Sequence, residues 1–303
     1  MTRGDGALAP IAILPVNNLL GEGILWDSRR RRLWWTDIQS RRLFRYDWAR
    51  GDIHRLEMPE RVGSFGLAAG SERLITAFES GLAWYDPQDE SVTWLARLGK
   101  LHPAVRFNDG RVDRQGRFWS GTMVEGDQPA VSAGLYSFDC RHGFRQHLSD
   151  VRISNSLCLS PDGRRLYFAD SPTRTIRVFE LDEREGTLGP GRVFVQTPVG
   201  AAPDGATIDA DGCLWSAHWG AGCVVRYTPE GQLDRTIRIP ASQPTCVCFG
   251  GPDLDVLCIT TARIGLSEAS SRTQPNAGDV FLYRVGVKGL PEAEYQPSDL
   301  QAS

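Results

Sequence analysis

The chain has 303 residues, ordinary hydrophobic and charged content, and a formal net charge of -3. This mildly acidic balance leaves no basic face that could grip phosphates, so no nucleic acid partner is expected. No apolar run reaches 18 residues, and the first ten residues lack the apolar core of a signal peptide. The sequence therefore predicts a cytoplasmic protein that does not associate with membranes.

A unit of two short strands joined by a tight turn recurs six times along the chain. Each copy has a polar or small first residue, an apolar strand, a turn rich in Gly, Asp or Ser, and a second strand rich in aromatic residues. The copies recur at intervals of roughly 41 to 50 residues, which is typical of propeller blades. They begin near residues 20, 64, 106, 153, 203 and 244.

Each copy continues into further strands. Third strands are expected at residues 42–46, 81–85, 134–138, 175–179, 223–227 and 280–283. Fourth strands are expected in the first five copies, at residues 54–58, 92–98, 144–148, 192–196 and 235–239. The sixth copy has no fourth strand of its own, because the chain after Val285 is a polar tail.

A spare apolar strand at residues 10–16 precedes the first copy. A sheet of three strands would leave an edge exposed, so this strand is expected to complete the last blade and close the ring. The sequence thus predicts an all-β, six-bladed β-propeller of four-stranded blades, formed by residues 1–303 as one domain. The segment 263–278, rich in Ser, Gly and Asn, is either a functional lid or a disordered excursion.

Seven cysteines are scattered without paired spacing, and their odd number is typical of reduced thiols rather than of a disulfide framework. Cys246 and Cys248 are two residues apart in an apolar strand, so both point to the same face. Packing in the core is the expected role of this pair, and a soft-metal site is the alternative.

The first residues of the innermost strands are the candidates for chemistry, because these strands all begin at one end of the propeller axis. Glu22, Asn155 and Asp204 hold equivalent positions in three different copies. Two carboxylates and an amide oxygen would form a hard site suited to Ca²⁺, Mg²⁺ or Mn²⁺. The competing explanation is that Asn, Asp and Gly stand at the heads of strands because such residues favour turns, and spacing alone leaves both explanations open.

Other catalytic motifs are absent from the sequence. There is no Gly-x-Ser-x-Gly elbow, no His-Glu-x-x-His and no Gly-rich phosphate loop. The segment Asp209-Ala210-Asp211-Gly212 resembles the start of a calcium loop but lacks the distal glutamate, so a hairpin turn is expected. His218 lies near the end of the second strand in the fifth copy. Its side chain could face the axis or pack against its neighbours, and it is a candidate substrate contact.

Several motifs, taken together and in order, resemble the gluconolactonase and regucalcin (senescence marker protein) family, and particularly its bacterial sugar-lactone lactonases such as xylonolactonase and arabinolactonase. They are Leu20-Gly21-Glu22-Gly23, Arg106-Phe107-Asn108-Asp109-Gly110, Ser154-Asn155-Ser156, Pro203-Asp204-Gly205 and Thr260-Thr261-Ala262-Arg263. The resemblance extends over about residues 18 to 285. It implies a six-bladed propeller that hydrolyses sugar lactones with the help of a metal ion.

The resemblance also implies roles for individual residues. Glu22, Asn155 and Asp204 match the family's metal ligands, and Asp204 is expected to assist proton transfer. Arg106 and Asn108 match the substrate-contacting pair, with Asn108 also near the metal. Glu125 is the single carboxylate that follows Gly-Thr-Met, where family members often carry one.

The expected activity is therefore metal-dependent hydrolysis of an aldonolactone to its aldonic acid. The alternatives are another metal-dependent ester or phosphotriester hydrolase and a non-enzymatic calcium-binding protein. One divalent ion is expected, among Ca, Mg, Mn, Zn and Fe(II), and the sequence does not choose between them. The expected partner is a small sugar lactone, and the expected state is a monomer or a weak homodimer.

Overall fold

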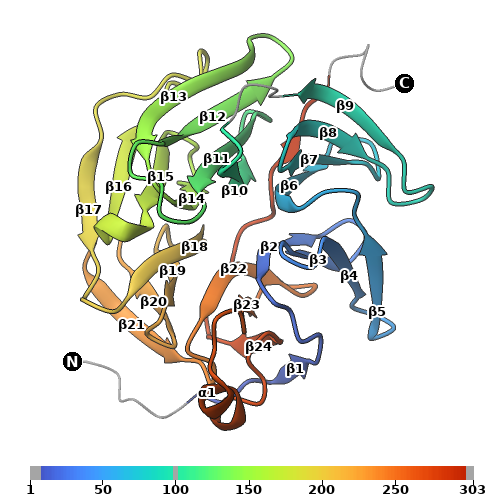
Figure 1. Ribbon diagram of the computed structural model, residues 1–303, viewed down its shortest axis with the longest axis vertical. Coiled ribbons are helices and arrows are strands. Elements are labelled where there is room, and N and C mark those ends of the chain that lie inside the picture. Colours follow the sequence, from blue (N-terminus) through green and yellow to red (C-terminus); the bar gives the residue numbers. More distant parts are fainter. Residues whose placement is uncertain (1–7, 98–101, 298–303) are drawn as a thin grey trace.

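The computed structural model describes residues 8–97 and 102–297, which form six β-sheets around a common axis, antiparallel except for one short parallel pairing (Figure 1). The sheets follow one another round the ring in chain order, which confirms the predicted six-bladed, all-β propeller. Each blade has one innermost strand, and the blades are numbered in chain order. From blade one to blade six these strands are β2 (Gly21–Asp27), β6 (Val62–Ala68), β10 (Val105–Val112), β14 (Ser154–Leu159), β18 (Ala202–Ile208) and β22 (Pro244–Gly250).

Each inner strand pairs with a second strand, and the pairing continues outward. The second strands are β3 (Arg32–Asp37), β7 (Leu74–Phe78), β11 (Phe118–Val124), β15 (Arg165–Asp170), β19 (Leu214–Trp219) and β23 (Val256–Thr261). The third strands are β4 (Arg42–Asp47), β8 (Gly81–Tyr85), β12 (Ala133–Asp139), β16 (Thr175–Glu180), β20 (Cys223–Tyr227) and β24 (Val280–Arg284).

The outer strands of the first five blades are amphipathic or exposed, whereas the inner strands are almost wholly buried between neighbouring blades. They are β5 (Asp52–Glu57), β9 (Val92–Arg97), β13 (Gly143–Val151), β17 (Arg192–Gln196) and β21 (Leu233–Arg238). The sequence predicts that the fourth strand of the second blade ends at Leu98, and this residue lies outside the described residues.

The last blade is completed by the beginning of the chain, as predicted. Strand β1 (Ala12–Leu14) pairs antiparallel with β24, with Ile13 opposite Phe281. Strands from opposite ends of the chain therefore share one sheet. Because neither strand can leave without breaking the ladder of the other, this pairing locks the ring.

The chain after Val285 is more than a polar tail, and here the sequence-based expectation was wrong. Strand β25 (Glu294–Tyr295) adds to the second blade in parallel with the end of β6. Tyr295 is fully buried, with its ring 5.4 Å from that of Trp84. In the sequence, β25 is marked by a single aromatic residue within a polar stretch. This apolar pattern is too short to predict a strand.

The segment leading to β25 crosses the axis of the ring (Figure 1). Gly289 forms a bridge with Asp209 of the fifth blade, and Glu292 forms a 2.7 Å ion pair with Arg111 of the third. Arg111 also donates to the Ala206 carbonyl oxygen at 3.0 Å. Because β25 pairs with the far end of β6, this segment covers the end of the axis opposite the strand starts.

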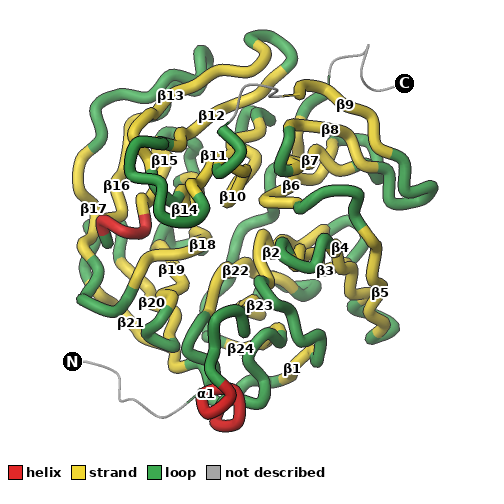
Figure 2. Tube along the Cα trace, viewed as in Figure 1, coloured by secondary structure: helices red, strands yellow, loops and turns green. Residues whose placement is uncertain are grey.

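Helical structure in the described residues is confined to η1 (Ser171–Thr173) and α1 (Glu268–Thr273), seen in red in Figure 2. Helix α1 lies inside the segment 263–278, where Ser267 caps it by accepting from Ser270 N. This segment is thus ordered, and the disordered alternative is not supported. Within the described chain, no helix has the length and apolarity needed to cross a membrane.

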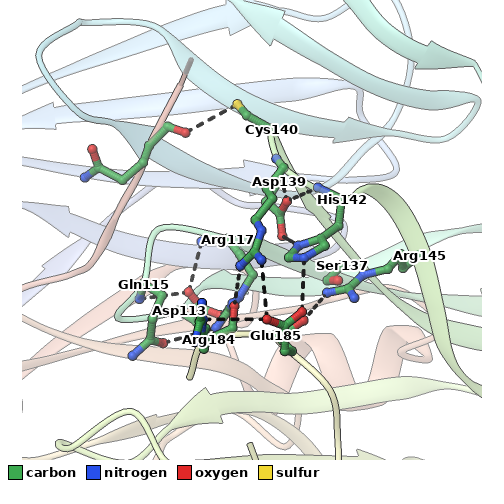
Figure 3. A network of polar contacts seen from close by, with 12 residues as sticks. Asp113, Gln115, Arg117, Ser137, Asp139, Cys140, His142, Arg145, Arg184 and Glu185 are labelled. Atoms are coloured by element: carbon green, nitrogen blue, oxygen red, sulfur yellow. Dashed lines mark hydrogen bonds and ion pairs between the residues drawn. The ribbon is translucent and has the colours of Figure 1, made fainter. Parts of the chain in front are cut away.

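An aspartate at the end of an inner strand fastens the following hairpin. Asp113 accepts hydrogen bonds from the Arg117 side chain and from Trp119 Nε1, both at 2.8 Å, and Arg117 continues toward the Arg184 backbone (Figure 3). Asp209 makes the same bond with Trp215 Nε1. The segment that begins at Asp209 is therefore a hairpin turn, as expected, and not a calcium loop.

All seven cysteines lie in the described residues, and their sulfur atoms are thiols that form no disulfide. Cys246 and Cys248 pack in the apolar core between the last and first blades, together with Cys258. This matches the predicted packing role.

Glu292→Gln is expected to lower the free energy of unfolding by about 3–5 kcal/mol, because it leaves the buried Arg111 cation without its partner. Urea denaturation measures this change. Glu294→Gln is the matched control, since Glu294 pairs with Arg29 at the surface and such a pair contributes about 0–1 kcal/mol. Equal losses in the two variants would contradict a stabilising role for the crossing segment.

Candidate active site

One irregularity recurs in all six inner strands and determines where the candidate residues point. From Glu22 to Leu25, β2 advances three residues while its partner β3 advances two, from Thr36 to Trp34. A β-bulge of this kind inserts one extra residue and re-aims the side chains beside it. The six bulges lie at Glu22/Leu25, Val62/Ser64, Phe107/Gly110, Asn155/Cys158, Pro203/Ala206 and Pro244/Val247.

Neighbouring bulges are packed against one another. A Cβ atom on Gly205 would lie 2.8 Å from the Cα of Cys246, and one on Gly63 would lie 2.4 Å from the Phe107 carbonyl oxygen. Such contacts are too short for any side chain, so glycine is required where the backbones meet. The close approach brings residues from different blades within contact distance at the start of the inner strands.

The carboxyl groups of Glu22 and Asp204 come together at this end of the axis, although they are far apart in the sequence. Both are buried, with exposures of 6% and 5%, and they are in hydrogen-bonding contact. Burial, followed by the nearby charge of Asp109, raises the pKa of Glu22 to about 8. Burial and the charge of Glu22 likewise raise the pKa of Asp204 well above its usual value.

The two candidate asparagines contact each other between the third and fourth blades. Asn108 Nδ2 donates to Asn155 Oδ1 at 3.2 Å and to the Ser154 carbonyl oxygen at 2.9 Å. Arg106 Nη1 donates to Asn108 Oδ1 at 2.8 Å. The structure thus places Arg106, Asn108 and Asn155 in one buried chain of hydrogen bonds.

Glu125 continues this chain outward. Its Oε1 accepts from Arg106 Nε at 3.0 Å, and both of its oxygens accept from Arg61, at 2.7 and 2.9 Å. Burial opposes ionisation of Glu125, but the hydrogen bonds from Arg61 and the charge of Arg106 outweigh it and lower the pKa. Glu125 is therefore an anion that holds Arg106 in place.

Arg61 is a site residue that the sequence did not reveal. It precedes the inner strand of the weakest repeat copy and belongs to no motif, so only its double hydrogen bond to Glu125 identifies it. Ser171, which bonds Asn155 from η1, was missed for a similar reason. It lies after the second strand of its blade, whereas the metal ligands predicted from the sequence lie at the starts of inner strands.

His218 is not part of the hydrogen-bond chain that contains Arg106, Asn108 and Asn155. Its side chain is buried, with Nε2 3.4 Å from the Tyr227 hydroxyl, and burial lowers its pKa to about 4. Hydrogen bonds from the His218 ring to Glu22, Asn155 or Asp204 are not found in the structure. Packing accounts for its position, and the substrate contact stays a prediction.

The donor set at this end fits a hard divalent cation. Two contacting buried carboxylates repel each other when both are ionised, and a cation between them would remove that cost. In the described part of the chain, no group of three or more His, Cys, Asp or Glu side chains could hold a metal ion. A metal site here would therefore depend on the amide oxygen of Asn155 as its third protein ligand.

Known proteins resemble this chain in sequence and in fold. The sequence model of a protein family, described as the SMP-30/Gluconolactonase/LRE-like region, matches residues 20–263. A 6-deoxy-6-sulfogluconolactonase of Pseudomonas putida is 38% identical over 91% of this chain and 94% of its own. An L-arabinolactonase of Azospirillum brasilense is 35% identical over 92% of each chain.

A solved structure resembles the chain over nearly its whole length. It is described as a calcium-binding protein, regucalcin, from Agrobacterium tumefaciens. The two structures superimpose with a TM-score of 0.89 at 31% identity, covering 95% of this chain and 98% of the other.

The crowding of Glu22 and Asp204 predicts how the stability of the metal-free protein depends on pH. An unfolded Glu loses its proton near pH 4.5, whereas folded Glu22 retains it up to about pH 8. The folded state thus binds the extra proton in this window, so the free energy of unfolding should fall as pH rises through it. Glu22→Gln should flatten this decline and make the chelator-treated protein more stable than wild type at pH 8.

Chemical denaturation at pH 5, 6, 7 and 8 measures the effect. Glu230→Gln, at an exposed hairpin, is the control and should leave the slope unchanged. A Glu22→Gln protein that is less stable than wild type at pH 8 would show that the carboxyl groups of Glu22 and Asp204 do not destabilise the fold.

Proposed function

This chain belongs to the SMP-30/Gluconolactonase/LRE-like family, and we propose that it hydrolyses a sugar lactone to the corresponding aldonic acid with one divalent cation. The observation that carries the proposal is the contact between the buried carboxyl groups of Glu22 and Asp204. The Asn155 amide is linked to the same inner strand through Ser171, which bonds the carbonyl oxygen of Pro203, the residue before Asp204. The names of the two lactonase relatives support the substrate class.

Glu22, Asn155 and Asp204 are the proposed ligands of the cation. When bound, a divalent cation supplies a Lewis acid for the lactone carbonyl and lowers the pKa of a water molecule. Asp204 accepts a proton from the attacking water, because burial and the charge of Glu22 raise the pKa of its carboxyl group and so make the carboxylate a stronger base.

Arg106 and Asn108 bind the hydroxyl groups of the sugar. The buried Arg106 has its Nε and Nη1 engaged by Glu125 and Asn108, so its plane is fixed. A fixed donor orients a hydroxyl at little entropic cost. Glu125 acts through Arg106, and we assign it to positioning rather than to direct substrate contact.

The activity is tested with a panel of pentono- and hexonolactones. The protein is stripped of metal and reconstituted with Ca²⁺, Mg²⁺, Mn²⁺, Zn²⁺ or Fe²⁺ in turn. Turnover that needs one of these cations supports the proposal, and equal turnover in stripped protein contradicts its metal-dependent part. Faster turnover of paraoxon would indicate a phosphotriesterase, and calcium binding without any turnover would indicate a non-enzymatic calcium-binding protein.

Asp204→Ala is expected to lower kcat on the responsive lactone by about a hundredfold or more, the scale of losing a key electrostatic group in an active site. Asp253→Ala, at an exposed hairpin of the sixth blade, should behave as wild type. Initial rates are measured by proton release at saturating cation. A loss of less than about threefold would remove Asp204 from the mechanism.

A further inference from the structure

Ser171 is a buried residue of η1 that connects two of the proposed metal-binding blades. Its hydroxyl lies 2.7 Å from the Pro203 carbonyl oxygen and 2.8 Å from Asn155 Nδ2. Its own backbone N–H donates to the Ile153 carbonyl oxygen at 3.0 Å, just before β14. Ser171 is thus held in place by the residue that precedes the strand whose asparagine it contacts.

The partners of Ser171 dictate the direction of its hydrogen bonds. A carbonyl oxygen only accepts, so the hydroxyl proton of Ser171 must point to Pro203. The hydroxyl oxygen is then left to accept, and the group of Asn155 that faces it must be the NH2. The amide oxygen of Asn155 is therefore turned away from Ser171.

The opposite side of the network imposes the same orientation. Arg106 has only donors, so the atom of Asn108 that it contacts must be Oδ1. Asn108 therefore presents its NH2 to the Ser154 carbonyl oxygen and to Asn155. Only the amide oxygen of Asn155 can accept this bond, in agreement with the direction set by Ser171.

We propose that Ser171 is a positioning residue that sets the polarity of the Asn155 amide, so that the oxygen and not the NH2 is offered to the divalent cation. This inference rests on the proposed function, because it assigns the third protein ligand of the same site. A flipped amide would present hydrogen atoms to the cation. With just two carboxylates beside it, the site then loses one of its three ligands.

Calcium binding to the metal-stripped protein tests the proposal without any use of activity. Ser171→Ala is expected to weaken Ca²⁺ binding, measured by calorimetry, by roughly tenfold or more, the usual effect of losing a residue that orients a metal ligand. Ser171→Thr retains the hydroxyl and should restore most of the affinity. Ca²⁺ affinity of Ser171→Ala equal to that of wild type would overturn the proposal.

A matched control separates positioning from general destabilisation. Ser137→Ala removes another buried hydroxyl, which bonds His147 at 2.7 Å in the third blade. It should lower the thermal midpoint of the stripped protein without changing Ca²⁺ affinity. If both variants weaken Ca²⁺ binding equally, the role of Ser171 is merely structural.

The Asn155→Asp background provides a second, independent measurement. A carboxylate has two equivalent oxygens and no polarity to set, so Ser171→Ala should change Ca²⁺ affinity there by less than about threefold. An equally large effect in both backgrounds would show that Ser171 does not act through the amide of Asn155.

The proposed function and this inference can fail separately. If wild-type protein binds none of the cations, the metal-dependent function fails, and the amide orientation is then measured directly. The side-chain NH2 of Asn155 should exchange its hydrogens slowly in ¹⁵N-labelled wild-type protein and faster in Ser171→Ala. Identical exchange rates in the two proteins would overturn the assigned polarity.

Discussion

The contact between neighbouring inner strands is the constraint on which the rest of the structure depends. Six strands can surround one axis only if their backbones approach closely, and Gly63 and Gly205 lie where a side chain would collide with the next blade. Each strand relieves this crowding with one extra residue. The same bulges aim the side chains of Glu22, Asn108 and Asp204 toward one end of the axis, so closure of the ring and assembly of the site have one cause.

The two ends of the axis balance charge in different ways. At the far end, Glu292 from the crossing segment neutralises Arg111, which leaves a complete ion pair. At the site end, Glu22 and Asp204 face each other, and burial keeps their pKa values high. A buried pair of like charges lowers the stability of the fold and is kept where chemistry uses it. The site end therefore carries an unfavourable electrostatic interaction. The strands β1 and β25 stabilise the fold in the sixth and second blades.

A continuous set of hydrogen bonds links four blades around the candidate site. It runs from Arg61 through Glu125, Arg106, Asn108 and Asn155 to Ser171 and ends at the Pro203 carbonyl oxygen. Because its arginines only donate and its carbonyl oxygen only accepts, the orientation of both amides is fixed from the two ends. Such a network orders the site before any substrate arrives, which is the condition for precise positioning.

The sequence by itself determined the blade count and the pairing of the segment 10–16 with the last blade, and it predicted the grouping of Glu22, Asn155 and Asp204. These features repeat at a fixed interval, and a repeat places equivalent residues in equivalent positions whatever the details of packing. The tertiary structure alone decided the contacts of Arg61, Ser171 and the segment that carries Glu292. Each of these makes contacts with residues far away in the sequence, and such contacts leave no periodic signal in the chain. It also decided that His218 packs against Tyr227, because the direction of a side chain near a strand end depends on the neighbouring blade.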